Sequence, residues 1–245
     1  MAKKKQTLTS TNVNKSKTHL SPCKAVSNPW TAISWKNTIA DCDKSIINPT
    51  YCALHGIDAL DLPEPYSGDF CNSNVVLLNL NPGLNPCSKA FYKNKTYFGE
   101  RKNTLLQNTA CGFMWFKNIT CNSGCLHSGC MWWKQKTKIL RGLITNRPLN
   151  LFVLEYFPYH TASSFNFPKN LPSNNFRDSL LCQAMVARKL LVIMRGTKLW
   201  DSLINRFSSV PYTNIIKAKN PQNFSLTPNN FNINDWNVLI NTLMS

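Results

Sequence analysis

The sequence predicts an α/β protein with a three-layer αβα architecture, in which helices cover both faces of a short, mainly parallel four-stranded sheet. The first observation is a set of strand-length apolar runs at residues 75–80, 149–154, 190–194 and 212–218. Helix-length segments separate several of these runs, as the long crossovers between parallel strands require. Each run also ends in a polar, loop-forming cluster. Because ligands bind beyond the carboxyl ends of parallel strands, we expect these clusters to converge on one site.

Length and composition fit one globular α/β domain over residues 26–245, preceded by a disordered basic tail at 1–25 that is rich in Lys, Thr, Ser and Asn. The 245 residues are 43% hydrophobic, enough for a full core, and no apolar run is long enough to span a bilayer. The basic start is followed by no apolar segment, so no signal peptide is expected. We therefore expect a cytoplasmic monomer that does not bind membranes.

The charge balance indicates a polyanionic partner. The chain has 28 Lys and Arg residues against 11 Asp and Glu residues, a formal net charge of +17. Such an excess on a soluble domain favours nucleic acid as the partner. The alternative is a generally basic protein that its charge keeps in solution. We expect DNA or another nucleic acid.

Periodicity predicts the elements around the strands. Residues 28–59 are expected to form a helical cap over the sheet. Two prolines one residue apart exclude a helix at 62–69, which should run extended into the first central strand. Asn234 is expected to cap a last helix. Apolar residues recur at helical spacing in three segments, 131–144, 174–188 and 197–207.

Ten cysteines in a chain without a secretion signal indicate reduced thiols or a metal site rather than a disulfide scaffold. Cys121, Cys125 and Cys130 surround His127 in a C-x3-C-x-H-x2-C pattern. Three thiolates and an imidazole could bind a structural zinc ion in tetrahedral geometry. The alternative is a Gly/Ser-rich loop with free thiols, and no other cofactor is expected.

The first two strand-end clusters carry the groups with the most useful chemistry. Asn81-Pro82-Gly83 makes a sharp turn, and the Asn81 amide can orient a water or a carbonyl without carrying charge. The same residues would also suit an ordinary turn. Residues 155–160 combine a carboxylate at Glu155 with phenols and an imidazole. They are rich in hydrogen-bonding groups, although no nucleophile stands beside the imidazole.

The last cluster begins at Asn220-Pro221 and continues as a polar loop with an apolar tip at Phe224 and Leu226. Such a tip can wedge between stacked bases. It can equally fix the loop to the core of its own domain. The sequence leaves both interpretations open.

The order of these motifs resembles the uracil-DNA glycosylase superfamily, in which a short parallel sheet presents its motifs from strand ends. Asn-Leu-Asn-Pro-Gly at 79–83 is similar to the G-I-N-P-G motif of the mismatch-specific branch, with Asn79 in place of the first Gly. Asn220-Pro221 is similar to the N-P-S-G motif of that branch or the H-P-S-P motif of the uracil-specific branch, with Gln222 in place of Ser.

A further similarity lies between these two motifs. Met194-Arg195-Gly196, followed by Trp200, stands where the superfamily has an L-W-G strand end. Glu155 and Tyr156 stand where the uracil-specific enzymes have a strand-end Asn that reads the base. The resemblance covers residues 75–226.

The resemblance implies a DNA repair enzyme that hydrolyses the N-glycosidic bond of a flipped-out damaged, mismatched or modified base. It implies that Asn81 positions the water, that Asn220 acts on the base or sugar side, and that Phe91 or Tyr92 stacks on the base. We assign base or DNA contacts to Pro82, Gly83, Glu155, Tyr156, His160, Arg195, Pro221, Asn223 and Ser225. The alternatives are a non-catalytic nucleic-acid-binding protein on the same fold and an unrelated α/β hydrolase or transferase.

Overall fold

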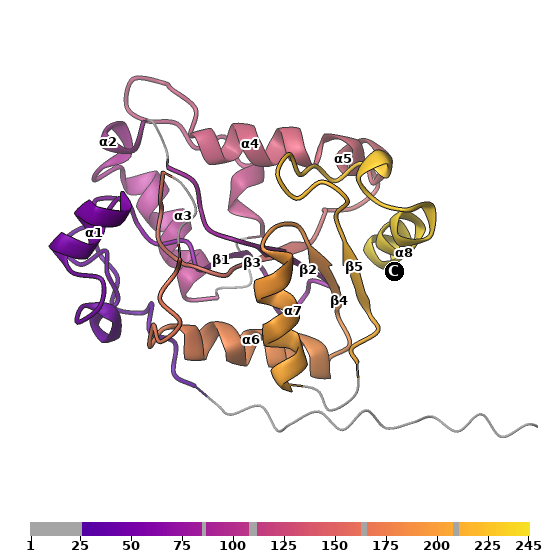
Figure 1. Cartoon of the computed structure of the whole chain (residues 1–245). Helices are drawn as coiled ribbons and strands as arrows, with labels where there is room; N and C mark the ends of the chain where they lie inside the picture. Colours follow the sequence, from indigo (N-terminus) through magenta and orange to yellow (C-terminus); the bar gives the residue numbers. More distant parts are fainter. Residues whose placement is uncertain (1–25, 85–86, 108–111, 163–165, 208–210) are drawn as a thin grey trace, which may run out of the picture.

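The fold centres on one mixed sheet (Figure 1). The computed structural model describes residues 26–84, 87–107, 112–162, 166–207 and 211–245. In these residues the strands occur in the order β1-β3-β2-β4-β5 across the sheet. The parallel pairs are β2 with β3, β2 with β4 and β4 with β5, whereas β1 runs antiparallel to β3. The strand bounds are β1 Tyr66–Gly68, β2 Val75–Asn79, β3 Leu151–Glu155, β4 Leu190–Ile193 and β5 Ile215–Lys217.

The α/β class is confirmed, and so is the parallel pairing of the four apolar runs as neighbouring strands. The sheet has five strands rather than the four predicted. The prediction that residues 62–69 are extended rather than helical is confirmed, but the segment does not continue directly into the central strand: it forms β1, an antiparallel edge on β3, and a turn separates it from β2. An edge strand tolerates nearby prolines, since its outer side needs no ladder donors. All three β1 residues are buried, so the segment lacks the alternation by which a strand is predicted.

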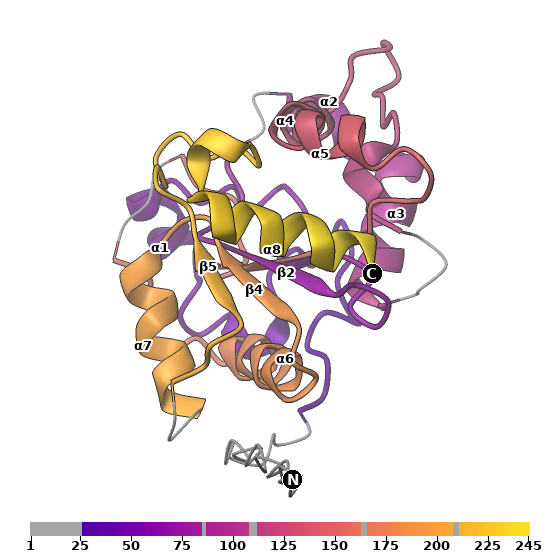
Figure 2. The same ribbon diagram turned by 90° about the vertical axis from the view of Figure 1, so that its right-hand side faces the viewer.

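Helices cover both faces of the sheet. In Figure 2, α6 (Asn174–Val186) and α7 (Thr197–Phe207) lie on one side of the strands and α8 (Ile233–Met244) lies on the other. The other helices are α1 Pro49–His55, α2 Ser88–Phe91, α3 Lys95–Leu105, α4 Ser128–Lys136 and α5 Lys138–Leu143, with a 3-10 turn, η3, at Met114–Phe116. No helix in the described ranges is both long enough and apolar enough to cross a membrane.

The predicted helices at 174–188 and 197–207 correspond to α6 and α7. The segment 131–144 is two helices, α4 and α5, which meet at Thr137. The Thr137 hydroxyl donates to the Trp133 carbonyl at 2.7 Å, and its backbone leaves helical geometry there. A hydroxyl bonded back to the preceding turn is a common cause of a bend.

Two predicted helix boundaries need correction. Asn232 rather than Asn234 caps α8, because its side chain accepts the Asp235 amide at 2.8 Å. Residues 28–59 contain only α1 and a 3-10 turn at Asp41–Asp43, so most of the expected helical cap is irregular. The tail predicted at 1–25 lies outside the described residues.

The pairing of β1 with β3 depends on a glycine. Gly68 has φ +101°, and a Cβ there would lie 2.0 Å from the Leu151 carbonyl oxygen. We expect Gly68→Ala to lower the free energy of unfolding by roughly 2 kcal/mol or more, because it adds backbone strain and a clash. Urea unfolding measures the change.

The control is Gly142→Ala in α5, where an added Cβ meets no atom within 4 Å. This variant should be neutral or more stable by up to about 1 kcal/mol, since Ala favours a helix over Gly. Equal stability of Gly68→Ala and the wild type would contradict the β1–β3 register.

Candidate functional site

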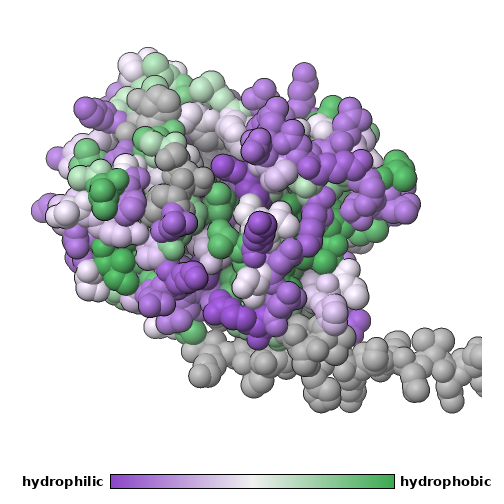
Figure 3. Space-filling model, viewed as in Figure 1, coloured by the Kyte–Doolittle hydropathy of each residue, from purple (hydrophilic) through white to green (hydrophobic). Residues whose placement is uncertain are grey.

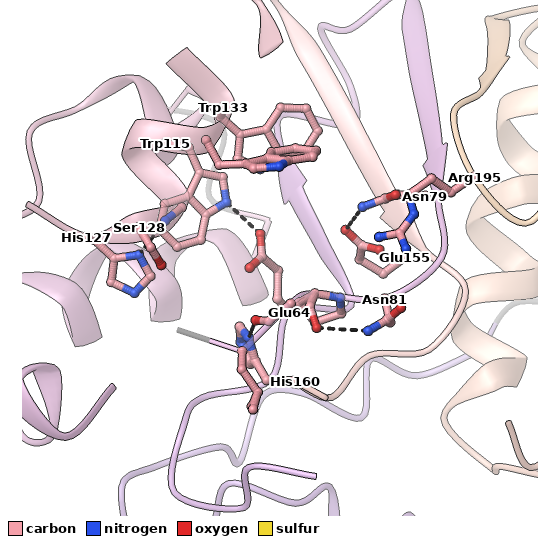
Figure 4. Close-up of a pocket in the computed structure, with 15 residues that line it drawn as sticks. Glu64, Asn79, Asn81, Trp115, His127, Ser128, Trp133, Glu155, His160 and Arg195 are labelled. Carbon is pink, nitrogen blue, oxygen red and sulfur yellow. Dashed lines mark hydrogen bonds between the residues drawn. The ribbon is translucent and has the colours of Figure 1, made fainter. Parts of the chain in front are cut away.

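A cavity of about 240 Å³ lies beyond the carboxyl ends of β2 and β3 (Figure 4). Its volume is just below the roughly 300 Å³ at which pockets for drug-sized ligands begin, so it suits a small ring system. Its lining residues come from strand ends, from the segment before β1, from η3 and from α4: Glu64, Asn79, Asn81, Pro82, Gly83, Leu84, Trp115, His127, Ser128, Gly129, Trp132, Trp133, Glu155, His160 and Arg195.

One wall of the cavity is aromatic. Trp115 of η3 and Trp132 and Trp133 of α4 line it, and the rings of Trp132 and Trp133 meet edge to face with centroids 4.7 Å apart. Gly129 lets the first turn of α4 contact Trp115 directly, because a Cβ there would lie 2.8 Å from the indole. The wall thus offers flat apolar surface to a planar ligand.

The opposite wall carries an amide and a carboxyl group, as Figure 4 shows. Asn79 and Glu155 end neighbouring parallel strands in register, and the Asn79 side-chain amide donates to Glu155 Oε1 at 2.8 Å. Burial raises the pKa of Glu155 well above its usual range, and the nearby Glu64 carboxylate acts in the same direction. This shift favours the neutral, protonated form of Glu155, in which one carboxyl oxygen is a hydrogen-bond donor.

Asn81 is held rigidly at the edge of the cavity. Its Nδ2 donates to Thr161 Oγ1 at 2.8 Å and to the Pro82 carbonyl at 3.1 Å. Within the described ranges no hydrogen bond engages Oδ1, so this atom is the one able to accept a hydrogen bond from a ligand or water. The turn after Asn81 is also fixed, since His160 Nδ1 lies 2.8 Å from the Gly83 carbonyl.

Glu64 contributes a carboxylate between the two walls (Figure 4). Its Oε1 accepts the Trp115 indole N–H at 2.5 Å and the Ser67 hydroxyl at 2.8 Å. Its Oε2 forms an ion pair of 3.1 Å with Arg101, whose side chain is completely buried. These contacts fix the position of the carboxylate. Arg195, at the end of β4, adds a cationic side chain beside Glu155.

The structure brings part of the predicted site together. Six predicted base- or DNA-contacting and catalytic residues line the cavity: Asn81, Pro82, Gly83, Glu155, His160 and Arg195. Seven others do not line it: Phe91, Tyr92, Tyr156, Asn220, Pro221, Asn223 and Ser225.

Asn220 lies in an exposed turn of its own. Its Oδ1 accepts the backbone amides of Gln222 at 3.2 Å and Asn223 at 3.0 Å, an arrangement typical of an Asx turn. Phe224 and Leu226 at the loop tip are buried. The second of the two interpretations of this loop therefore holds: the apolar tip fixes the loop to the core.

The aromatic residues expected to stack on a base lie elsewhere. Phe91 is buried, and its ring packs edge to face on His127 with centroids 4.6 Å apart. Tyr92 is exposed, and its ring centroid lies 5.5 Å from that of Trp35. Tyr156 points to the other side of β3, against Trp200 at 5.4 Å.

Sequence reasoning missed Glu64, Asn79 and the tryptophan wall. The helical spacing of Trp132 and Trp133 predicts core positions, and no local signal distinguishes a wall of the core from a wall of a cavity. Glu64 stands between two prolines, where the sequence shows only an extended chain. Asn79 could have been found, because it is a polar residue at the end of an apolar run. In the structure it lies directly beside Glu155.

The Cys/His pattern forms a hairpin that leads into α4. The Cys121 amide donates to the Cys125 carbonyl at 2.9 Å. His127 caps α4, since its Nδ1 accepts the Gly129 amide at 3.0 Å. Burial lowers the pKa of His127 to about 3, and the Arg101 charge adds to the effect. Among the described side chains, no group of three or more His, Cys, Asp and Glu could hold a metal.

The sequence matches no protein-family model, and no curated protein or solved structure matches it.

The raised pKa of Glu155 predicts a pH-dependent stability. The unfolded chain loses this proton above about pH 4.3, whereas the folded protein keeps it, so the contribution of Glu155 to stability falls as pH rises, by up to about 1.4 kcal/mol per pH unit. Glu155→Gln carries no titrating group at this position. Its free energy of unfolding relative to wild type should therefore increase between pH 5 and pH 7, measured by urea unfolding. A constant difference over this range would show that Glu155 is not a buried neutral acid.

The zinc site remains a prediction that metal analysis tests. If Cys121, Cys125, His127 and Cys130 rearrange around zinc, purified protein should contain about one equivalent, and Cys125→Ser should lose it. Cys42→Ser, which removes an exposed thiol outside the motif, is the control. Protein without metal would leave the free-thiol loop as the correct interpretation.

Proposed function

We propose that this chain is a DNA glycosylase-like hydrolase that cleaves the N-glycosidic bond of a flipped-out base. The observation that carries the proposal is the cavity, in which a tryptophan wall faces Asn79 and Glu155 at the carboxyl ends of parallel strands. A base taken out of a duplex needs an aromatic or apolar surface for its ring and hydrogen-bonding groups for its edge. The net charge of +17 supplies the general attraction to DNA.

The tryptophan wall is proposed to take the stacking role that Phe91 or Tyr92 was expected to have. Trp133 is almost fully buried, so its position is fixed before a ligand enters. The Asn79–Glu155 pair would bind the edge of the base. An amide beside a neutral carboxyl group offers both donors and acceptors, which every base edge requires.

The proposed chemistry follows from charge. Cleavage leaves positive character on the sugar and negative charge on the departing base, so groups that match these charges lower the barrier. Asn81 Oδ1 would accept a hydrogen bond from the attacking water, the Glu155 proton would stabilise the departing base, and the Glu64 carboxylate would face the sugar. Asn220, outside the cavity, would contact DNA next to the extruded nucleotide.

A second candidate is a non-catalytic nucleic-acid-binding protein on the same fold. The position of Asn220 favours it, because an amide committed to its own turn does not take part in the reaction. Release of a free base distinguishes the two candidates, since only an enzyme leaves an abasic site.

Asn81→Ala should reduce base release at least 100-fold and leave DNA affinity nearly unchanged, because its contribution lies in the transition state. The substrates are oligonucleotides with uracil, mismatched thymine, hypoxanthine or alkylated bases, scored for alkali-labile breaks. The control is Asn150→Ala. Asn150 is exposed and directly precedes β3, at the end of the strand opposite to the cavity. If the wild type yields no abasic site on any substrate, the enzyme assignment is wrong and the binding-protein candidate replaces it.

A further inference from the structure

A second, open cleft of about 680 Å³ lies between α6, α7 and the loop before α6. It is separate from the cavity with the tryptophan wall and shares no lining residue with it. Hydrophilic side chains cover much of this face, including the region over α6 and α7 (Figure 3). The lining comprises Tyr156, Lys169, Asn170, Leu171, Pro172, Asn174, Asn175, Arg177, Asp178, Lys198, Leu199, Ser202, Leu203 and Arg206.

The cleft begins one residue away from the cavity. Glu155 ends β3 and lines the cavity, whereas the next residue, Tyr156, lines the cleft. Tyr156 lies in the bend directly after β3, so the two hollows flank the carboxyl end of the same strand. The Tyr156 ring is fixed there, against Trp200 on one side and below the Arg177 guanidinium at 4.3 Å on another.

The cleft has positive charge that protein groups do not neutralise. Its one carboxylate, Asp178, accepts from Arg177 Nε at 2.8 Å and Nη2 at 2.6 Å and lies 3.3 Å from Arg206. Arg177 is buried and also donates to the Tyr156 carbonyl at 2.7 Å, so it is a structural cation. Asp178 is thus shared between two arginines.

Two lysines on the rims remain unneutralised. Lys169 lies in the loop before α6 and Lys198 lies in the first turn of α7, and both are exposed. Neither has an ion pair with any described residue. Asn170, Asn175 and Ser202 add further hydrogen-bond donors to the lining of the cleft. Exposed cations and neutral donors around an open cleft suit phosphate groups, which bind through charge-assisted hydrogen bonds and carry no sequence information.

We propose that this cleft binds the phosphodiester backbone of the nucleic-acid strand whose extruded base enters the cavity. Lys169 and Lys198 each neutralise a phosphate, and Arg206 contacts the strand from the outer rim. The inference rests on the proposed function, because it assigns the flanking part of the same substrate. A strand that passes around the carboxyl end of β3 reaches both hollows.

The test is the salt dependence of oligonucleotide binding by the full chain. Each phosphate contact contributes about 0.7 to the slope of log K against log salt for a single strand and about 0.9 for a duplex. Lys169→Gln/Lys198→Gln should therefore lower the slope by about 1.4 or 1.8. Fluorescence anisotropy with a labelled oligonucleotide over a range of NaCl concentrations measures it.

The control double variant is Arg147→Gln/Arg188→Gln, which removes the same net charge. Arg147 precedes β3 and Arg188 precedes β4, so both lie toward the amino ends of these strands. This variant should change the slope by less than about 0.5, since only long-range charge is lost. Circular dichroism and urea unfolding confirm that both double variants fold.

The outcomes separate the two proposals. Equal slope changes in the two double variants, or no change in either, would overturn the cleft assignment and leave the proposed function intact. Absence of oligonucleotide binding by the wild type would overturn the proposed function and the cleft assignment with it.

Discussion

The buried ion pair between Arg101 and Glu64 is the interaction on which the cavity depends. Arg101 is completely buried, and its charge is compensated by Glu64 at 3.1 Å and by the face of Trp115, 4.9 Å from the guanidinium. Removing one partner of such a pair typically costs on the order of 3–5 kcal/mol, because the other charge stays buried without compensation. The pair therefore ties α3, the segment before β1 and η3 into one arrangement.

This arrangement determines both walls of the cavity. Glu64 fixes the Trp115 indole through its N–H, and Trp115 in turn supports the first turn of α4 through the contact at Gly129. On the opposite wall, the Glu64 charge helps to keep Glu155 protonated. The two carboxyl groups of this small cavity thus have different neighbours, because Glu64 pairs with an arginine and Glu155 accepts from an amide. That difference is the usual basis for assigning acid and electrostatic roles.

The sequence was sufficient for the parallel core and for about half of the site. Continuous apolar runs such as 190–194 are typical of parallel strands that are buried on both faces. Because ligand sites lie beyond the carboxyl ends of such strands, the sequence also predicted that Asn81 and Glu155 lie near each other. Site residues that are positioned by contacts between distant segments could not be predicted from the sequence. Trp115 and Glu64 lie 51 positions apart along the chain and meet only after the fold forms.

The sequence left the role of the Asn220 loop open for a related reason. Its composition fits insertion into DNA as well as burial, and only the packing of Phe224 and Leu226 decides between them. β1 was not predicted because a three-residue strand with every residue buried shows no alternation of apolar and polar residues. The spacing of apolar residues predicted one continuous helix where Thr137 separates α4 from α5. The loop and β1 are thus decided by tertiary contacts, whereas the break at Thr137 comes from a side-chain bond to the preceding turn.

The end of β3 separates two kinds of binding. On one side, Glu155 lines a cavity, and burial there favours the neutral form of its carboxyl group. On the other, Tyr156 lines a cleft whose Lys169 and Lys198 form no ion pair with any described residue. Contacts to phosphates are strong at low salt and carry no sequence information, whereas neutral hydrogen bonds to a base edge discriminate and depend little on salt. If both proposals hold, the residues on either side of the end of β3 divide affinity from selectivity: the cleft at Tyr156 supplies salt-dependent affinity, and the cavity at Glu155 supplies discrimination between bases.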